Sequence, residues 1–273
     1  MIREDSPKIL EEFLSYPISG TEEIFRRFEG LPGAIAGRGS DPMERYVCIP
    51  GTREDGIVLV AHADTVWDAA YGDGGENALS FENGYYKSGN GTCGIGADDR
   101  AGCAMLWLLR DSGHTLLLVN GEEKGKRGAK FLRSSNPELF ARLNRHCFML
   151  ELDSYDTGRC NFNQVDNTRR FKKYITRQLG FRDDTQSGGC DLQVLCEKIC
   201  GVNIGIGYHY HHTYAEYLSL AEWENTLSCV EKVLQRSHCR FRTSVPKKLQ
   251  HTFAASVNFA AKALKKLLHI RSE

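Results

Sequence analysis

The 273-residue chain carries no net charge and has no stretch apolar enough to cross a membrane. Lysine and arginine together number 35, as do aspartate and glutamate, so the chain lacks the basic character of a nucleic-acid-binding protein. Its apolar runs, such as GIVLVA and HTLLLV, are far shorter than the about 20 residues of a membrane-spanning helix. We therefore expect neither nucleic acid nor a membrane among its partners.

Signals of secretion and of disulfide bonding are also missing. The first residues, MIREDSPKILEEF, have no apolar signal-peptide core and instead indicate a helix capped by Ser6, with Pro7 at its first position. None of the ten cysteines forms a CxxC pair, and we expect reduced thiols in a cytoplasmic protein. We interpret Cys190, Cys196 and Cys200 as buried apolar side chains, the last two on one helix face, rather than as a metal site.

Apolar runs alternate with helical patterns along most of the chain. Strands are predicted at Tyr46–Ile49, Gly56–Ala61, His114–Val119, Cys147–Leu152 and Val202–Tyr208. Helices are predicted at 21–28, 100–110, 126–133, 137–143, 169–179 and 191–199, and after the capping box of Ser219 and Glu222. This alternation predicts a three-layer α/β/α fold around a mostly parallel sheet. No repeat or linker interrupts it, so we expect one domain over residues 1–273, with a long loop at Tyr71–Asn90.

Acidic and histidine residues follow several of the predicted strands. The clusters are His62 and Asp64 after GIVLVA, Glu122 and Glu123 after HTLLLVNG, Asp153 after CFMLEL, and Tyr208–Glu216 after VNIGIG, while Asp98 and Asp99 lead into a helix. In open parallel sheets, ligands bind outside the carboxyl ends of the strands, so these clusters can converge. Imidazoles with carboxylates suit a zinc-like cation. The number of carboxylates suggests two ions that share one of them.

The order of these motifs resembles the co-catalytic di-zinc exopeptidase clan, which includes peptidase T, the acetylornithine deacetylase group and the lidless aminopeptidases. The motifs are AHADTV (61–66), GADDRAG (96–102), NGEEKGKRGA (120–129), ELD (151–153) and HTYAE (212–216). They extend over more than half of the chain. The resemblance implies the phosphorylase/hydrolase-like zinc exopeptidase fold and two divalent metal ions, with Zn²⁺ as the expected metal.

The resemblance also implies a set of metal ligands. Asp98 would bridge the two ions, His62 and Asp153 would complete the first site, and Glu123 and His212 would complete the second. The HTxxE spacing favours His212 as the last ligand. Strand alternation implies that neighbouring histidines cannot both face the metals, so His211 is the competing choice.

Two further roles follow from the resemblance. Glu122 would be the general base and acid of catalysis, and Asp64 would orient the ligand His62. The peptide bond between Asp98 and Asp99 is expected to be cis, as is common in the clan. From the residues themselves, Tyr208 and His209 are further candidates to contact substrate.

Substrate choice is less determined. Only 59 residues (212 − 153) separate Asp153 from His212, too few for an inserted lid domain in addition to the predicted helices and strand. We expect a lidless enzyme that cleaves small peptides from a free N-terminus. The alternatives are an N-acyl amino acid amidohydrolase and a metal-binding relative without activity. The loop acids Asp73, Glu76 and Glu82 could bind a substrate ammonium group, although loop acids are usually only solvated.

The end of the sequence has a different character. Residues 246–273 carry six basic residues and one acidic residue, with an apolar stripe at helical spacing. We expect this helix to pack on the domain with its lysines in water. Docking on an anionic membrane or a partner protein is the alternative.

Overall fold

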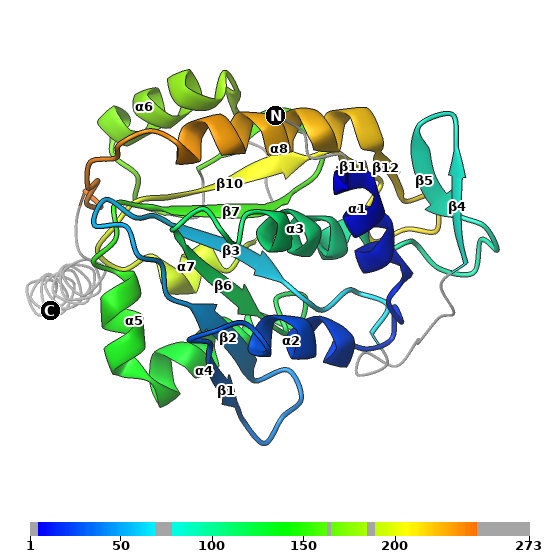
Figure 1. Cartoon of the computed structure of the whole chain (residues 1–273), viewed down its shortest axis with the longest axis horizontal. Helices are drawn as coiled ribbons and strands as arrows, with labels where there is room; N and C mark the ends of the chain where they lie inside the picture. The colour runs from blue at the N-terminus through cyan, green and yellow to red at the C-terminus, as the bar shows by residue number, and fades with distance from the viewer. Residues whose placement is uncertain (1–4, 69–77, 163–164, 185–188, 245–273) are drawn as a thin grey trace, which may run out of the picture.

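A computed structural model describes residues 5–68, 78–162, 165–184 and 189–244 (Figure 1). The predicted helix at 246–273 and the loop acids Asp73 and Glu76 lie outside the described residues. No described helix has both the length and the apolar character needed to span a bilayer.

An eight-stranded sheet forms the centre of the molecule, in the order β1-β2-β6-β3-β7-β10-β8-β9. The strands are β1 (Ile35–Arg38), β2 (Arg45–Ile49), β3 (Val58–His62), β6 (Thr115–Val119), β7 (Met149–Ser154), β8 (Thr157–Asn161), β9 (Arg182–Asp184) and β10 (Gly201–Ile206). The four central strands β6, β3, β7 and β10 are parallel, whereas β1, β2 and β8 each run antiparallel to a neighbour. The predicted largely parallel sheet is confirmed, although β1, β8 and β9 were not predicted.

Helices cover both faces of this sheet, which makes the fold three-layered as predicted (Figure 1). They are α1 (Ser6–Ser15), α2 (Glu22–Glu29), α3 (Ala97–Leu108), α4 (Arg127–Ser135), α5 (Pro137–Leu143), α6 (Arg169–Leu179), α7 (Leu192–Leu195) and α8 (Leu220–Leu234). Alternate residues of β3 enter separate cores: Leu59 belongs to the core that includes buried residues of α1, α2, α3, α6 and α8, and Val60 belongs to the core that includes those of α4, α5 and α7. Burial on both faces explains why the central strands are apolar at every position.

Several helix boundaries differ from the prediction by one to four residues, and two of the differences change the role of a residue. Ser6 lies inside α1, whose N-cap is Asp5, so the expected cap at Ser6 is wrong. The helix predicted at 191–199 ends at Leu195, because the side-chain oxygen of Asn144 accepts hydrogen bonds from the amides of Glu197 and Lys198 and turns the chain away.

This early helix end changes the interpretation of the neighbouring thiols. Cys196 and Cys200 do not share a helix face, although both are buried, as is Cys190. Among the described residues, the candidate metal-ligand groups contain no cysteine. The interpretation of these thiols as buried apolar side chains therefore agrees with the structure.

A small second sheet replaces part of the predicted loop at Tyr71–Asn90. It has the order β11-β12-β5-β4, formed by β4 (Leu79–Glu82), β5 (Tyr85–Ser88), β11 (Tyr208–His209) and β12 (Tyr217–Ser219). The hairpin forms because Asn83 (φ 52°) and Gly84 (φ 85°) supply the two positive φ angles of a type I′ turn. The Asn-Gly pair was the signal that the loop prediction overlooked.

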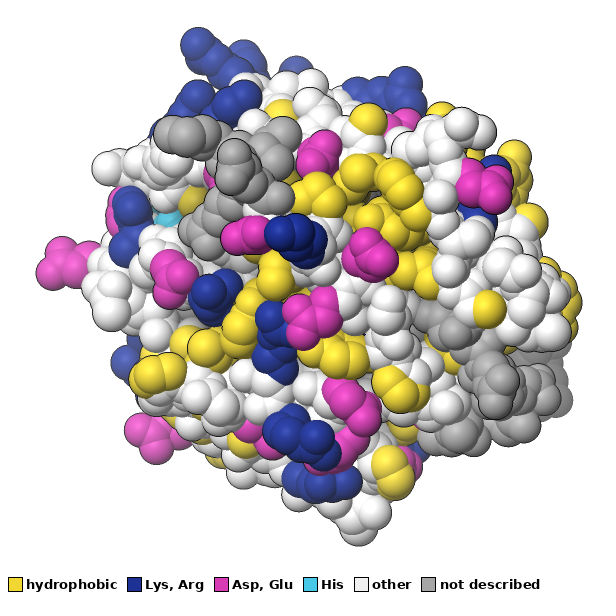
Figure 2. All heavy atoms as spheres, turned by 45° about the vertical axis from the view of Figure 1, so that its right-hand side comes forward, with side chains coloured by type: hydrophobic (Ala, Val, Ile, Leu, Met, Phe, Trp, Pro, Cys, Tyr) yellow, Lys and Arg dark blue, Asp and Glu magenta, His cyan; other side chains and the backbone are white. Residues whose placement is uncertain are grey.

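The small sheet lies at the end of the molecule toward which β3 points (Figure 1). That is the carboxyl end of the parallel strands, where the polar clusters of the sequence were expected to meet. On the face that Figure 2 brings forward from this side, basic and acidic side chains are interspersed.

Candidate metal centre

The five predicted metal ligands meet at the carboxyl end of the central sheet. His62 is the last residue of β3, and its Nε2 lies 3.2 Å from Asp98 Oδ1 and 3.5 Å from Asp153 Oδ1. Asp98 comes from the start of α3 and Asp153 from β7. All three side chains are buried, with exposed fractions of 1–8%. Three separate elements thus bring a compact group of nitrogen and oxygen donors together.

A second group forms on the other oxygen of Asp98. Asp98 Oδ2 lies 3.1 Å from His212 Nε2, and the same nitrogen lies 2.6 Å from Glu123 Oε1. Asp98 therefore contacts both groups through different oxygens. This is the arrangement expected of a carboxylate that two cations share.

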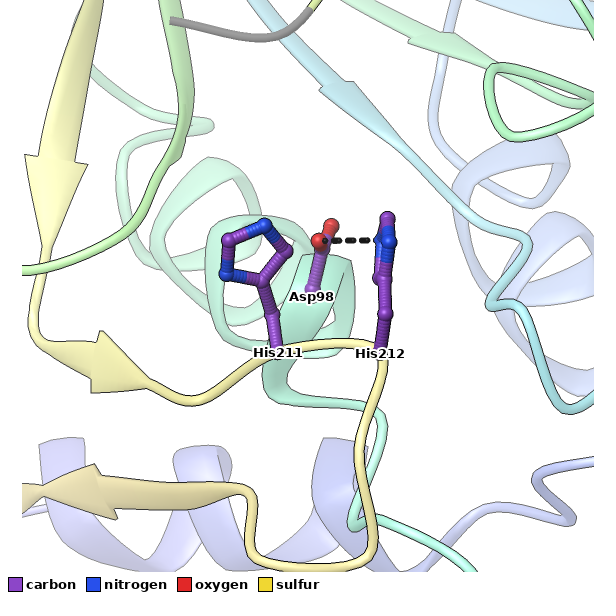
Figure 3. A group of neighbouring side chains, drawn as sticks. All are labelled: Asp98, His211 and His212. Carbon is purple, nitrogen blue, oxygen red and sulfur yellow. Dashed lines mark ion pairs between the residues drawn. The ribbon is translucent and has the colours of Figure 1, made fainter. Parts of the chain in front are cut away.

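His211 and His212 both approach Asp98, which corrects the argument from strand alternation. Strand β11 ends at His209, and positive φ angles at Tyr210 (53°) and His212 (62°) break the alternation of the following side chains. Figure 3 shows Asp98 between the two imidazoles, with the ion pair to His212. His211 stacks on Tyr155 at 5.4 Å between ring centroids, and it also belongs to a possible ligand group with Asp98.

Asp64 connects the ligand His62 to the loop that carries the glutamates. Its Oδ1 lies 3.3 Å from His62 Nδ1, and its backbone carbonyl lies 3.0 Å from the same nitrogen. The two carboxylate oxygens also accept hydrogen bonds from the amides of Glu122 and Glu123, each at 3.2 Å. One fully buried carboxylate therefore fixes the positions of the imidazole and of both glutamates.

Asp99 and Glu216 hold the start of α3 in place. Asp99 Oδ2 accepts from the amide of His62 at 3.0 Å, and its peptide bond to Asp98 is cis, as expected. Glu216 Oε2 and Oε1 accept from the amides of Gly96 at 2.8 Å and Asp98 at 3.2 Å. Glu216 belongs to the HTYAE motif, but the sequence analysis assigned it no role of its own.

Asp153 is held in a similar way. Asn203 donates a side-chain hydrogen bond to the Asp153 carbonyl and accepts one from the Asp153 amide at 3.1 Å. Tyr208 is buried and donates to Asp153 Oδ1 at 3.2 Å. His209, the other candidate for substrate contact, instead stacks on Tyr217 and pairs with Glu222 at 2.6 Å.

Glu122 lies on the turn after β6, next to the ligand Glu123. Its carboxylate is mostly buried and pairs with Lys126 Nζ at 3.2 Å. Burial raises its pKa, an effect that the positive charges of His62 and Lys126 oppose. A raised pKa suits a carboxyl group that must both accept and donate a proton near neutral pH.

Two buried acids behind Glu122 were missed by the sequence analysis. Asp191 is fully buried, and burial together with the charges of Glu122 and Glu151 raises its pKa well above its usual value. Glu151 is also fully buried and accepts from the Asp191 amide at 3.0 Å; burial and the charge of Asp153 raise its pKa to about 8. Asp191 had been interpreted only as the start of a helix, and Glu151 as a strand residue.

The electrostatics of the site fit divalent cations. Burial and the charge of Asp98 raise the pKa of Glu123 to about 8. Burial raises the pKa of Asp153 to about 7, while His62 opposes the shift and Asp98 adds to it. Burial opposes protonation of His212, but hydrogen bonds to Asp98 and Glu123 raise its pKa to about 10. Buried carboxylates with raised pKa values need positive charge, and their oxygens, with the imidazole nitrogens, are donors that zinc-like ions accept.

A cavity of about 270 Å³ opens onto these residues. Its walls are formed by Asp98, Glu122, Glu123, Gly125, Lys126, Asp153, Ser154, Tyr155, Asn161, Gly189, Asn203, Tyr208, His211 and His212. Pockets for drug-sized ligands span about 300–1,000 Å³. This cavity therefore suits a small substrate that touches Glu122 and the ligand groups at once.

No protein-family model and no curated protein matches the sequence. The structure is similar to that of the aminopeptidase PepT from Bacillus cereus, with a TM-score of 0.63 and 17% identity, over 85% of this chain and 98% of that chain. It is also similar to that of a tripeptidase from Staphylococcus aureus, with a TM-score of 0.61 and 15% identity, over 86% of this chain and 98% of that chain. The comparison with the TET1 peptidase from Pyrococcus horikoshii gives a TM-score of 0.59 and 15% identity, over 84% of this chain and 99% of that chain. The chain has the fold of these peptidases.

At these identities the comparison establishes the fold and leaves the chemistry to the side chains. It agrees with the clan resemblance found in the motifs. The seven residues that the resemblance singled out all lie at one end of the sheet, in contact with one another.

Proposed function

We propose that this protein is a zinc-dependent hydrolase that cleaves an amide bond at the end of a small peptide. One observation carries the proposal. The carboxylate of Glu122 lines the same cavity as Asp98, the residue whose two oxygens contact both groups of possible ligands. The first cation would be held by His62, Asp98 and Asp153, and the second by Asp98, Glu123 and His212.

Each residue around the proposed metal ions has a separate role in catalysis or in holding a ligand. When bound, the cations would supply positive charge that activates water and polarises the scissile carbonyl. Glu122 accepts the proton of the attacking water and returns it to the leaving amine. Asp64 holds His62 in orientation and fixes the backbone that carries Glu122. Asn203 and Tyr208 hold Asp153 in the same way.

The site is proposed to work without a lid domain. The described elements between Asp153 and His212 are β8, α6, β9, α7, β10 and β11, of which all but β11 belong to the central sheet or cover it. Only short gaps at 163–164 and 185–188 lie outside the described residues. Small peptides therefore enter a cavity whose described walls come from the central sheet, its helices and the loops that join them.

The direct test is the metal content of protein purified without chelator, measured by elemental analysis. We expect close to two zinc ions per chain, and we expect chelation to remove the metal and amide hydrolysis together. Aminoacyl chromogenic amides and dipeptides would be assayed beside N-acetyl amino acids. Hydrolysis of the N-acetyl compounds alone would favour the amidohydrolase alternative.

Failure of the proposal has a clear form. A chain that takes up no zinc, manganese or cobalt would show that the ligand groups do not act as a metal site. A chain that binds two ions but hydrolyses neither class of amide would be the inactive metal-binding relative.

A further inference from the structure

Lys126 gives the cavity a positively charged group that the clan resemblance does not assign. Among the described residues that line the cavity, it is the only lysine or arginine. Its side chain is 16% exposed, and its Nζ lies 3.2 Å from Glu122 Oε1. The ammonium group therefore stands directly beside the proposed general base.

The backbone directs this side chain into the cavity. Lys126 is the N-cap of α4 and has a positive φ of 63°, which is rare for a non-glycine residue. Its amide and that of Gly125 both donate to the Glu122 carbonyl at 2.9 Å. Gly189 also lines the cavity, and a Cβ at that position would come within 2.5 Å of Lys126 Nζ, so the ammonium lies directly beside this backbone.

We propose that Lys126 binds the free α-carboxylate of the residue that leaves on hydrolysis, so that the preferred substrates are dipeptides. The inference rests on the proposed function, because it assigns Glu122 to the scissile amide. An ammonium has three donors, so Lys126 can hold Glu122 and a substrate carboxylate together. Charge-assisted hydrogen bonds of this kind are among the strongest that a site can offer.

The distances favour the α-carboxylate over a carboxylate farther along the peptide. To protonate the leaving nitrogen, Glu122 must lie about 3 Å from it. Lys126 Nζ lies 3.2 Å from Glu122 Oε1, so when Oε1 is the oxygen that faces the leaving nitrogen, the ammonium lies at most about 6 Å from that nitrogen. The α-carboxylate carbon of a dipeptide is two bonds from the same nitrogen and is within reach. In a tripeptide the carboxylate lies one residue farther away, up to about 3.6 Å.

The other possible role of Lys126 is to adjust Glu122 alone. A nearby positive charge stabilises the ionised carboxylate and lowers its pKa. That role would act on every substrate equally, whereas recognition of a carboxylate would act only on substrates that carry one. The two roles can therefore be separated by substrates that differ only at the C-terminus.

The experiment compares X-Ala dipeptides with the corresponding X-Ala amides, using metal-loaded full-length protein. We expect the wild type to prefer the dipeptides, and we expect Lys126→Met to lose about 10–100-fold in kcat/KM for dipeptides, mainly through KM. The amides should lose clearly less than the dipeptides, because they lack the carboxylate that Lys126 would bind, although both share any effect on Glu122. Lys126→Arg should restore part of the preference. Lys124→Met is the matched control, because Lys124 lies on the same turn but is exposed and outside the cavity lining.

Equal losses for dipeptides and amides, with a shifted acid limb in the pH profile of kcat, would overturn the inference and leave Lys126 as a positioning residue. Calorimetric binding of Ala-Ala and Ala-Ala amide supplies a measurement that is independent of turnover. If the wild type hydrolyses neither compound, the proposed function fails. Recognition of the carboxylate by Lys126 would still be supported if Ala-Ala bound more tightly than its amide and Lys126→Met abolished the difference. Equal binding of the two compounds would contradict it.

Discussion

The two ends of the central sheet both collect histidines but place them in opposite environments. At the carboxyl end, His62 and His212 lie among carboxylates, and these contacts raise their pKa values although burial acts against them. At the amino end, His114, His146 and His238 lie against backbone and aromatic groups, and burial lowers their pKa values. The carboxylates thus favour the protonated form of His62 and His212, whereas burial favours the neutral form of the three histidines at the amino end. At the carboxyl end His211 differs from its two neighbours, because burial lowers its pKa.

Hydrogen bonds at the amino end require the neutral form. His114 Nδ1 accepts from the amide of Ile57 at 3.1 Å, while its Nε2 faces the carbonyl of Leu234 at 3.0 Å. One nitrogen must accept and the other must donate, which only the neutral imidazole can do. His114 therefore joins the start of β3 to the end of α8 as a structural connector.

The contrast explains why one end of the sheet is suited to chemistry and the other is not. At the amino end every polar atom of His114 has a partner within the chain. At the carboxyl end the carboxylates outnumber the imidazoles, and Glu123 and Asp153 have raised pKa values, so added positive charge would stabilise their ionised forms. Variants at the carboxyl end should accordingly lose activity or metal affinity, whereas variants at the amino end should lose stability.

The largest effect is expected for Glu122→Gln at the carboxyl end. Removing a general acid–base group typically costs about 10²–10⁴-fold in rate, and turnover should fall by that amount. The two metal ions should stay bound, because Glu122 is not one of the proposed ligands. Kinetics and elemental analysis on the same preparation measure both outcomes. Full turnover in a metal-replete Glu122→Gln protein would remove Glu122 from the mechanism.

A second prediction compares two adjacent histidines. His212→Ala should lower the affinity for the second ion by more than the about 10–100-fold that loss of an outer partner costs, because His212 contacts both Asp98 and Glu123. His211→Ala is the matched control and should keep both ions. Titration with zinc against a chromogenic chelator gives the two affinities. The reverse result would make His211 the ligand.

A smaller effect is expected at Asp64, which touches the ligand His62 and not the proposed metal positions. Asp64→Asn should reduce metal affinity by about 10–100-fold, since the amide cannot replace both carboxylate acceptors of the Glu122 and Glu123 amides. The same chelator titration measures it, with Glu138→Gln, an exposed acid on α5, as the control. Unchanged affinity would mean that His62 keeps its orientation without Asp64.

Much of this arrangement could be predicted because it depends on local patterns. Continuous apolar runs identified the buried strands, and the polar residues at their ends identified the carboxyl end of the sheet. Ser219 caps α8 as predicted, with its hydroxyl accepting from the Glu222 amide, although the Ser219 amide donates to the Gly207 carbonyl and not to the Glu222 side chain. Each of these features is decided by neighbours within a few residues.

What could not be predicted depends on partners distant in the sequence. Asn144 ends α7 by bonding residues more than 50 positions away. Lys126 was one charge in a basic stretch until the fold placed it against the cavity, and Asp191 was one helix-start residue until the fold buried it behind Glu122. The roles of the site residues stay predictions, because their proximity alone does not establish catalysis.

The smallest expected effect belongs to the amino end and concerns stability against acid. Burial, with the charges of His114 and Arg53, lowers the pKa of His238 to about 4, while Asp55 opposes the shift. In the unfolded chain this histidine takes up a proton near its usual pKa of about 6.5. As the pH falls from about 6.5 to about 4, the unfolded state therefore binds a proton that the folded state does not, and stability decreases.

His238→Gln tests this assignment, because glutamine does not titrate. Its side-chain oxygen can still accept a hydrogen bond from the Tyr174 hydroxyl, which lies 3.0 Å from His238 Nδ1. Denaturant midpoints would be measured between about pH 7 and pH 5 for both proteins. The variant can be less stable at neutral pH, but its free energy of unfolding should fall less steeply as the pH is lowered. The slope of that free energy against pH should differ between the two proteins by at most the binding of one proton. Parallel curves would show that His238 is protonated in the folded chain as easily as in the unfolded one. The amino end would then lose the property that distinguishes its histidines from those at the metal centre.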